Sequence, residues 1–181
     1  MKTYGVLNIV AHPHSSGTYR RVFEQLSSTG TGIQFYSDRY AALTPISETR
    51  DDVFTGRLAT WTQIDTSENA INLLDFKEVE FDQSGIVIPE SMGFNSRIFQ
   101  YAFNEKKHRL VIETENDQGK QQSIGFAAKA FSALISNSKF SGIDEITVHV
   151  ATKKDAIDRI FSLPVVRKVT IDLALPNPDD L

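Results

Sequence analysis

The stretch RIFQYAFNEKKHRLVIETE, residues 97–115, carries the pattern that decides the fold. RIFQYAF and HRLVIETE are short runs rich in aromatic and aliphatic side chains, which is typical of β-strands. Between them, residues 104–107 are the polar run NEKK, which suits a four-residue hairpin turn. The sequence therefore predicts a β-hairpin in the second half of the chain.

The elements after this hairpin alternate between helix and strand. Residues 123–137 place apolar side chains on one helical stripe, which predicts an amphipathic helix. EITVHVA (residues 145–151) and RKVTIDLAL (residues 167–175) alternate apolar and polar side chains, as half-buried strands do. DAIDRIF (residues 155–161) between them predicts a short helix. From Arg97 onward the predicted order is β-β-α-β-α-β.

Clean alternation in these strands implies that one face of the sheet is polar, so the helices should cover mainly the other face. The expected fold is α+β, with a mixed, mainly antiparallel sheet and helices on one face, ferredoxin-like or related to it. We expect a single domain over residues 1–181, with sub-lobes at 1–96 and 97–181 as an alternative. The first half could then be a second, degenerate copy of the same layout.

The first half begins with a strand followed by a helix. Residues 4–11 are almost continuously apolar, which predicts a strand covered on both faces. Ser16 or Thr18 is the expected N-cap of the helix that follows. One helical stripe comprises Tyr19, Val22, Phe23 and Leu26.

Residues 33–96 are predicted to hold several short strands. IQFY, RYAAL and GRLATWTQI each suit a strand, and GRLATWTQI suits one best. Residues 65–85 are charged and irregular, which predicts a long surface excursion. GIVIPES, residues 85–91, is expected to be a short strand that ends at Pro89, and SETRDD, residues 47–52, a loop.

Composition excludes several function classes. The 181 residues include no cysteine, so disulfides, thiolate chemistry and cysteine-based zinc sites are absent. The net charge of −4 argues against a surface that coats nucleic acid indiscriminately, although a local basic patch is compatible with it. No apolar run reaches the ~20 residues that span a bilayer. We expect a cytoplasmic protein without a membrane segment or a cofactor.

His12 and His14 lie between the first strand and the first helix. Pro13 separates them, and neither His108 nor His149 has metal-ligand spacing to the pair, so no metal is expected. An alternative is metal-independent RNA cleavage. In that reading His14 exchanges a proton with the ribose 2′-hydroxyl, and Arg20 and Arg21 stabilise the phosphorane. These three would be its catalytic residues.

The predicted hairpin tip holds the densest basic run of the chain. Its members are Lys106, Lys107, His108 and Arg109, and they are the candidate nucleic-acid-binding residues. Phe99, Tyr101 and Phe103 alternate in the adjoining strand. Aromatic rings on an open sheet stack RNA bases, whereas rings at this spacing in a half-buried strand form core. The sequence favours core.

A series of short motifs in a fixed order resembles a bacterial family of domains of unknown function. The motifs are HPHS (12–15), TWTQID (60–65), IPE (88–90), HRLVIET (108–114), LP (163–164) and PNPDDL (176–181). The resemblance covers almost the whole chain and implies a bacterial or mobile-element origin, in genome-defence neighbourhoods. It also implies that relatives continue past residue 181. It supplies no activity and no catalytic residues.

Three functions follow as hypotheses. The first is a non-enzymatic interaction domain that binds RNA, DNA or a partner protein in a bacterial defence or mobile-element system. The second is the endoribonuclease built on His14. The third is a structural subunit of a larger assembly, in which the exposed edge of strand 167–175 pairs with another sheet, either of a partner protein or of a second copy.

Overall fold

The computed structural model describes residues 3–30, 32–50, 52–89 and 91–151. The predicted helix at 155–161 and the predicted strand at 167–175 lie outside these residues, and so does the sheet edge expected there. No helix within the described ranges is long and apolar enough to cross a membrane.

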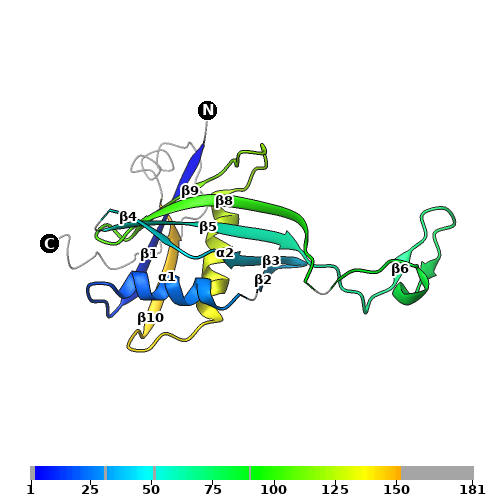
Figure 1. Ribbon diagram of the computed structural model, residues 1–181, viewed down its shortest axis with the longest axis horizontal. Helices are drawn as coiled ribbons and strands as arrows, with labels where there is room; N and C mark the ends of the chain where they lie inside the picture. The colour runs from blue at the N-terminus through cyan, green and yellow to red at the C-terminus, as the bar shows by residue number, and fades with distance from the viewer. Residues whose placement is uncertain (1–2, 31, 51, 90, 152–181) are drawn as a thin grey trace, which may run out of the picture. The chain divides into compact units, whose positions relative to one another are not determined.

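Eight strands of the described chain form one antiparallel sheet (Figure 1). They are β1 (Tyr4–His12), β2 (Ile33–Tyr36), β3 (Arg39–Leu43), β4 (Ser47–Arg50), β5 (Val53–Thr62), β8 (Phe94–Asn104), β9 (Arg109–Glu113) and β10 (Glu145–Val150). Seven of them run in the order β10-β1-β9-β8-β5-β3-β2, and β4 pairs with β5. The first strand of the chain therefore lies between two strands from its second half.

The predicted hairpin is confirmed. β8 and β9 are antiparallel neighbours, and Asn104 pairs with Arg109 at the end of the ladder. Residues 105–108 form the turn between the two strands. The expected strands of the first half are also present as β1, β2, β3 and β5, and EITVHV forms β10.

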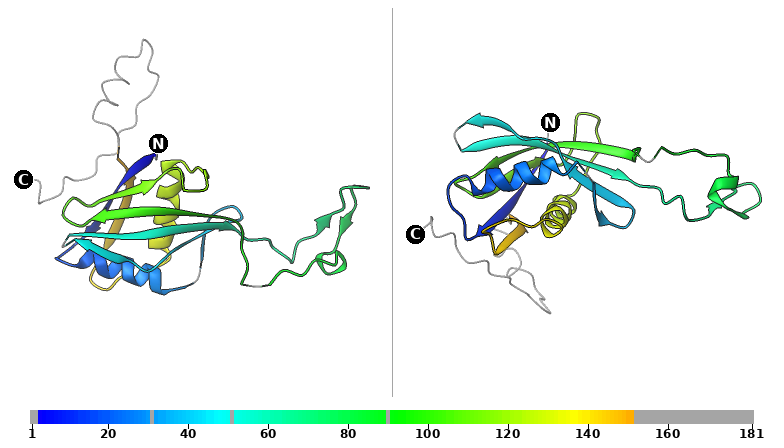
Figure 2. Two further views of the ribbon diagram at one scale, coloured as in Figure 1. Left: turned by 45° about the horizontal axis from the view of Figure 1, so that its top comes forward. Right: turned by 60° about the horizontal axis from the view of Figure 1, so that its bottom comes forward.

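Two helices of the described chain, α1 (Thr18–Ser28) and α2 (Ile124–Ser136), lie on the same side of the sheet (Figure 2). The predicted helix at 123–137 is confirmed at both ends, since Ser123 and Asn137 are its caps. The predicted N-cap of α1 is wrong: Gly17 occupies that position. The Thr18 hydroxyl instead accepts a hydrogen bond from the Ser15 backbone N–H (3.0 Å), in the turn before the helix.

Aromatic side chains fill the space between the sheet and the helices. Phe99, Tyr101 and Phe103 of β8 are 0–3% exposed and point toward the helices. Phe103 packs against Phe23 of α1 and against Phe54 of β5, with ring centroids 5.1 and 5.3 Å apart. The expectation that these three rings belong to the core is therefore confirmed, and they are not available to stack bases.

β1 is buried on one face only. Leu7, Ile9 and Ala11 are fully buried beneath the helices, whereas Val6 and Val10 on the opposite face are half-buried. The expectation of a strand covered on both faces was wrong. The near-continuous apolar run reflects a central position between β9 and β10, where neighbouring strands cover much of the outward side chains.

The excursion predicted at residues 65–85 is confirmed as a mainly exposed segment between β5 and β8 (Figure 1). It contains a two-stranded sheet of β6 (Ala70–Ile71) and β7 (Glu78–Val79), then a short 3-10 helix, η1 (Phe81–Gln83). The predicted strand GIVIPES is wrong, because residues 85–89 join no ladder and all but Ile88 are exposed. SETR, expected to be a loop, forms β4 through its pairing with β5.

Tyr101 gives the core a pH dependence that can be measured. Its hydroxyl is buried and makes no hydrogen bond with any described residue, and burial raises the pKa of Tyr101. A pKa that is higher in the folded state leaves stability unchanged below about pH 10, the unfolded value, and lowers stability as pH rises above it.

We therefore predict that Tyr101→Phe increases the free energy of unfolding by about 1 kcal/mol at neutral pH, because it removes an unsatisfied polar group. The variant should also lose less stability than the wild type above about pH 10. Urea denaturation across the pH range measures both effects. Tyr36→Phe, at an exposed tyrosine, should change neither, and a Tyr101→Phe curve that follows the wild type would contradict the prediction.

Candidate functional site

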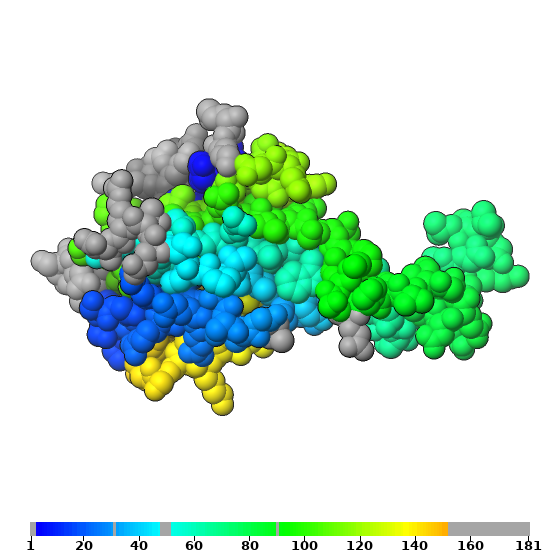
Figure 3. Space-filling model, viewed as in Figure 1, coloured from blue at the N-terminus to red at the C-terminus, as the bar shows by residue number. Residues whose placement is uncertain are grey.

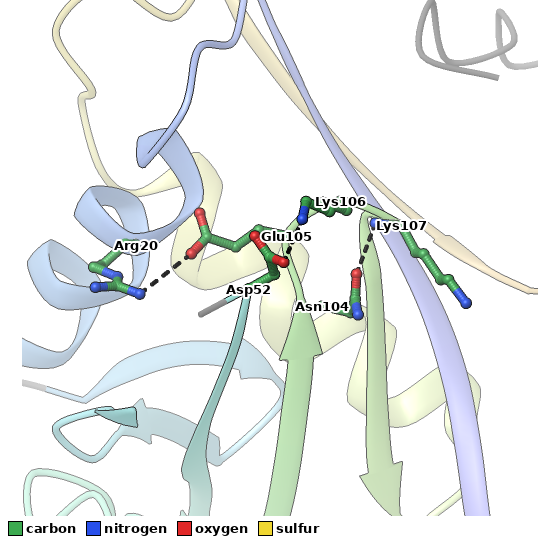
Figure 4. A network of polar contacts seen from close by, with 6 residues as sticks. All are labelled: Arg20, Asp52, Asn104, Glu105, Lys106 and Lys107. Carbon is green, nitrogen blue, oxygen red and sulfur yellow. Dashed lines mark hydrogen bonds and ion pairs between the residues drawn. The ribbon is translucent and has the colours of Figure 1, made fainter. Parts of the chain in front are cut away.

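The basic hairpin tip lies at the turn between β8 and β9, and its side chains point in different directions (Figure 4). Lys106 forms an ion pair with Asp52, which immediately precedes β5. The Lys107 backbone N–H donates to Asn104 Oδ1 (2.8 Å), which holds the turn closed. Lys107 and Arg109 are exposed. The described tip is therefore less positive than its sequence suggests, because a carboxylate neutralises one lysine.

Glu105 connects the same turn to the first helix. Its Oε1 lies 3.6 Å from an Nη atom of Arg20, and the two side chains are 15% and 31% exposed (Figure 4). Arg21 is directed elsewhere, with an Nη atom 3.4 Å from the Thr18 hydroxyl. The two arginines predicted to act together thus have separate partners, and only Arg20 faces the hairpin turn.

His108 is buried, unlike the other members of the basic run. It is the last residue of the turn and has a φ of 51°, and its side chain is 4% exposed. Its ring lies edge-on to that of His14, at 4.6 Å and 90°, and 4.8 Å from the ring of Tyr19. A phosphate cannot reach this ring from solvent in the described conformation, so the candidate nucleic-acid contacts reduce to Lys106, Lys107 and Arg109.

The histidine corner, which we define as His12, His14, His108 and Tyr19, brings together three of the four histidines of the chain. His14 Nδ1 donates to the Ala11 carbonyl (2.9 Å), and Tyr19 Oη accepts from the Ala11 N–H (3.1 Å). Both contacts fix rings against the end of β1. His14 is half-buried, and its ring packs against those of His12, Tyr19 and His108.

Sequence reasoning missed the meeting of His14 with His108. The residues are 94 positions apart and are brought together by the pairing of β1 with β9, in which Asn8 lies opposite Arg109. The Ile9 N–H also donates to the His108 carbonyl (3.0 Å). In the sequence His108 is the first residue of the strand predicted after the NEKK turn, and that position does not identify the neighbouring strand.

The side chains of the histidine corner suit proton transfer better than metal binding. Within the described ranges, no group of three or more histidine, aspartate and glutamate side chains is arranged to hold a metal ion. Imidazole side chains are the groups that most often transfer protons in general acid–base catalysis. Arg20, one of the two arginines that RNA cleavage would use, is held by Glu105 at the hairpin turn.

A second feature is the outer face of the sheet, which we define as the face opposite α1 and α2. Arg57 of β5 lies opposite Gln100 of β8 in the ladder, and both side chains are exposed. Glu113 is 3% exposed, and its Oε2 accepts from the Gln100 N–H (3.0 Å). With Asn116 these residues line a polar hollow of about 270 Å³. Arg109 belongs to the same face, because its neighbour Leu110 is buried beneath the helices.

The excursion between β5 and β8 exposes large apolar side chains. They are Ile71, Leu73, Leu74, Phe76, Ile86 and Val87. Leu74 is 93% exposed and Val87 is 90% exposed, and the segment forms much of the green surface in Figure 3. Exposed large apolar side chains gathered in one segment suit a contact with another protein if they form one patch.

Comparison with known proteins identifies the family and no activity. No curated protein and no solved structure matches the chain. A family model described as a domain of unknown function, DUF4747, matches residues 2–181. The resemblance to such a family, inferred from the order of short motifs, is therefore confirmed, and the chain belongs to the DUF4747 family.

Proposed function

We propose that this protein is a non-enzymatic interaction domain that binds nucleic acid, RNA in preference to DNA, in the cytoplasm. The observation that carries the proposal is the outer face of the sheet. Arg57 is exposed there and lines the polar hollow, and Arg109 is exposed elsewhere on the same face. Guanidinium groups suit phosphates, and polar side chains on an open sheet suit the edges of unpaired bases. A role in bacterial defence or a mobile element rests on the family resemblance alone.

The proposal includes a ferredoxin-like unit. The elements β1, α1, β8, β9, α2 and β10 follow the order β-α-β-β-α-β, and their strands lie in the order β10-β1-β9-β8, each antiparallel to its neighbour. On this interpretation β2–β5 are an insertion that widens the sheet, and one unit uses both halves of the chain in place of two copies. The fold alone does not specify an activity.

A partner protein, or a second copy of this chain, is the other ligand that the interaction proposal includes. The exposed apolar side chains of the excursion support it, because they remain in water in the isolated chain. This contact would use a different surface from the outer face.

If RNA binds near the hairpin, affinity should fall steeply with salt, since each phosphate contact releases counterions. We predict that the double variant Lys106→Glu, Lys107→Glu weakens binding of a short oligoribonucleotide by at least about tenfold at low salt. Fluorescence anisotropy with labelled RNA at about 50 and about 200 mM salt measures this.

The matched control is Lys129→Glu, Lys139→Glu, which makes the same charge change on exposed lysines of the helical side. It should retain most of the affinity. Salt-independent binding, or an equal loss in the control, would remove the hairpin from the proposed interface.

The second candidate function is metal-independent endoribonuclease activity. The specific observation in its favour is the half-buried His14 ring, held by Ala11 and backed by His108 and Tyr19. In this proposal His14 takes the proton from the ribose 2′-hydroxyl as the 2′-oxygen attacks phosphorus. The protonated His14 then gives the proton to the 5′-oxygen as the P–O5′ bond breaks, which leaves a 2′,3′-cyclic phosphate, and Arg20 and Arg21 stabilise the phosphorane. For Arg20, this requires that substrate compete with Glu105.

We predict for this candidate that His14→Ala abolishes RNA cleavage, a loss of at least about a hundredfold for a general acid–base group, without unfolding the protein. His149→Ala, at an exposed histidine of β10, is the control and should cleave normally. A gel assay with single-stranded RNA, with and without EDTA, measures cleavage by both variants. Cleavage that survives His14→Ala, or that EDTA stops, is incompatible with the mechanism.

A further inference from the structure

Trp61, the only tryptophan of the chain, lies on the outer face near the end of β5. Its neighbour Thr60 is 1% exposed and points toward the helices, so the indole points the other way. In the ladder Trp61 lies opposite Tyr40 of β3. The two rings are nearly parallel, with centroids 6.2 Å apart and an interplanar angle of 22°.

The indole is held by backbone on two sides. A Cβ added at Gly32 would overlap the six-membered ring of Trp61, and a Cβ added at Gly93 would overlap its pyrrole ring. Trp61 Nε1 donates to Gln63 Oε1 (3.3 Å). These three contacts fix the plane of the ring in advance, which lowers the entropy cost of stacking a ligand on it.

The stacked pair lines a hollow of about 600 Å³, together with Gln63, Met92 and Ser96. Sites for small ligands commonly measure about 300–1,000 Å³, so this volume is sufficient for at least one nucleotide. Ser96 also lines the polar hollow that contains Arg57 and Gln100. The two hollows therefore adjoin, and an aromatic platform is followed along the outer face by hydrogen-bonding groups and a guanidinium.

We propose that Trp61 and Tyr40 form a stacking subsite for an unpaired base of a single-stranded nucleic acid, whose neighbouring nucleotide extends toward Arg57. This inference rests on the proposed nucleic-acid binding and specifies its ligand as single-stranded. An aromatic platform stacks any base, and polar side chains beside it can pair with base edges. An apolar peptide would use the platform but would leave the amide and hydroxyl groups of Gln63, Ser96 and Gln100 without partners.

This subsite differs in position from the aromatic run that the sequence offered for stacking. Phe99, Tyr101 and Phe103 face the helices, whereas Tyr40 and Trp61 come from β3 and β5 and face outward. Single-stranded nucleic acid would thus lie across β3, β5 and β8, and the hairpin tip would contact phosphates at most at one end.

Intrinsic fluorescence tests the inference directly, because Trp61 is the only tryptophan and all tryptophan emission therefore comes from the proposed subsite. We expect a single-stranded oligoribonucleotide to quench Trp61 saturably, and a duplex of the same sequence to quench it much less. An oligodeoxynucleotide arm separates RNA from DNA. Binding of labelled RNA should weaken by about tenfold to a hundredfold in Trp61→Ala, as for the loss of one stacked base. Trp61→Phe should retain most of the affinity.

Tyr36→Ala, at an exposed tyrosine of β2 outside the aromatic hollow, is the matched control and should bind normally. If Trp61→Ala fails to fold by circular dichroism, Trp61→Leu keeps a larger apolar side chain without an aromatic face and should show the same loss of affinity. RNA binding that leaves the fluorescence and the Trp61 variants unchanged would overturn the subsite and leave nucleic-acid binding intact. If no nucleic acid binds to the wild type, both the subsite and the proposed nucleic-acid binding are wrong. The same holds if a proline-rich peptide quenches the Trp61 fluorescence and no nucleic acid does.

Discussion

β1 pairs on one side with β9 and on the other with β10, and the rest of the described structure depends on this placement. The strand comes from the start of the chain, and both of its neighbours come from more than 100 residues later. Leu7, Ile9 and Ala11 complete the buried face beneath the helices. Without β1, the pair β9–β8 and the strand β10 would be separate edges with exposed backbone groups. Such non-local pairing closes late in folding, because long loops must first be ordered.

Both candidate sites are consequences of that sheet. The histidine corner exists because β1 ends next to the turn between β8 and β9, which brings His14 to His108. The outer face exists because side chains alternate along each strand, so every buried residue of β5 has an outward neighbour. Leu58 and Thr60 point to the core, while Arg57 and Trp61 point away from it. One architecture thus places the histidine corner and the outer face, to which we assign the two proposed functions, at different positions.

The sequence predicted elements whose signals are local. The β8–β9 hairpin, the helix over residues 123–137 and the apolar stripe of α1 each depend on signals between near neighbours in the sequence, and each is present. The α+β class with a mainly antiparallel sheet followed from the same signals. GIVIPES failed for the opposite reason, because a strand also needs a neighbour to pair with, and the described chain supplies none there.

The sites required non-local information that no pattern contains. His108 looked like one more member of a basic run, and only the position of β1 shows that its ring is enclosed. In the sequence Trp61 stands out only as the single tryptophan of the chain, and the hollow beside it depends on Tyr40, Gly32 and Gly93, which come from three other segments. The net charge of the hairpin tip could not be predicted from its own residues either, because Asp52, 54 positions earlier in the chain, forms an ion pair with Lys106.

Native-state hydrogen exchange at the amides of β1 tests the central placement of that strand most directly. The Ile9 N–H, which donates to the His108 carbonyl, should exchange only through global unfolding, with the same free energy as the amides of β8 and β9. Amides of the exposed excursion should exchange far faster. If the β1 amides instead exchange as fast as those of the excursion, β1 is not an integral strand of the sheet, and the account of the fold and of the histidine corner is wrong.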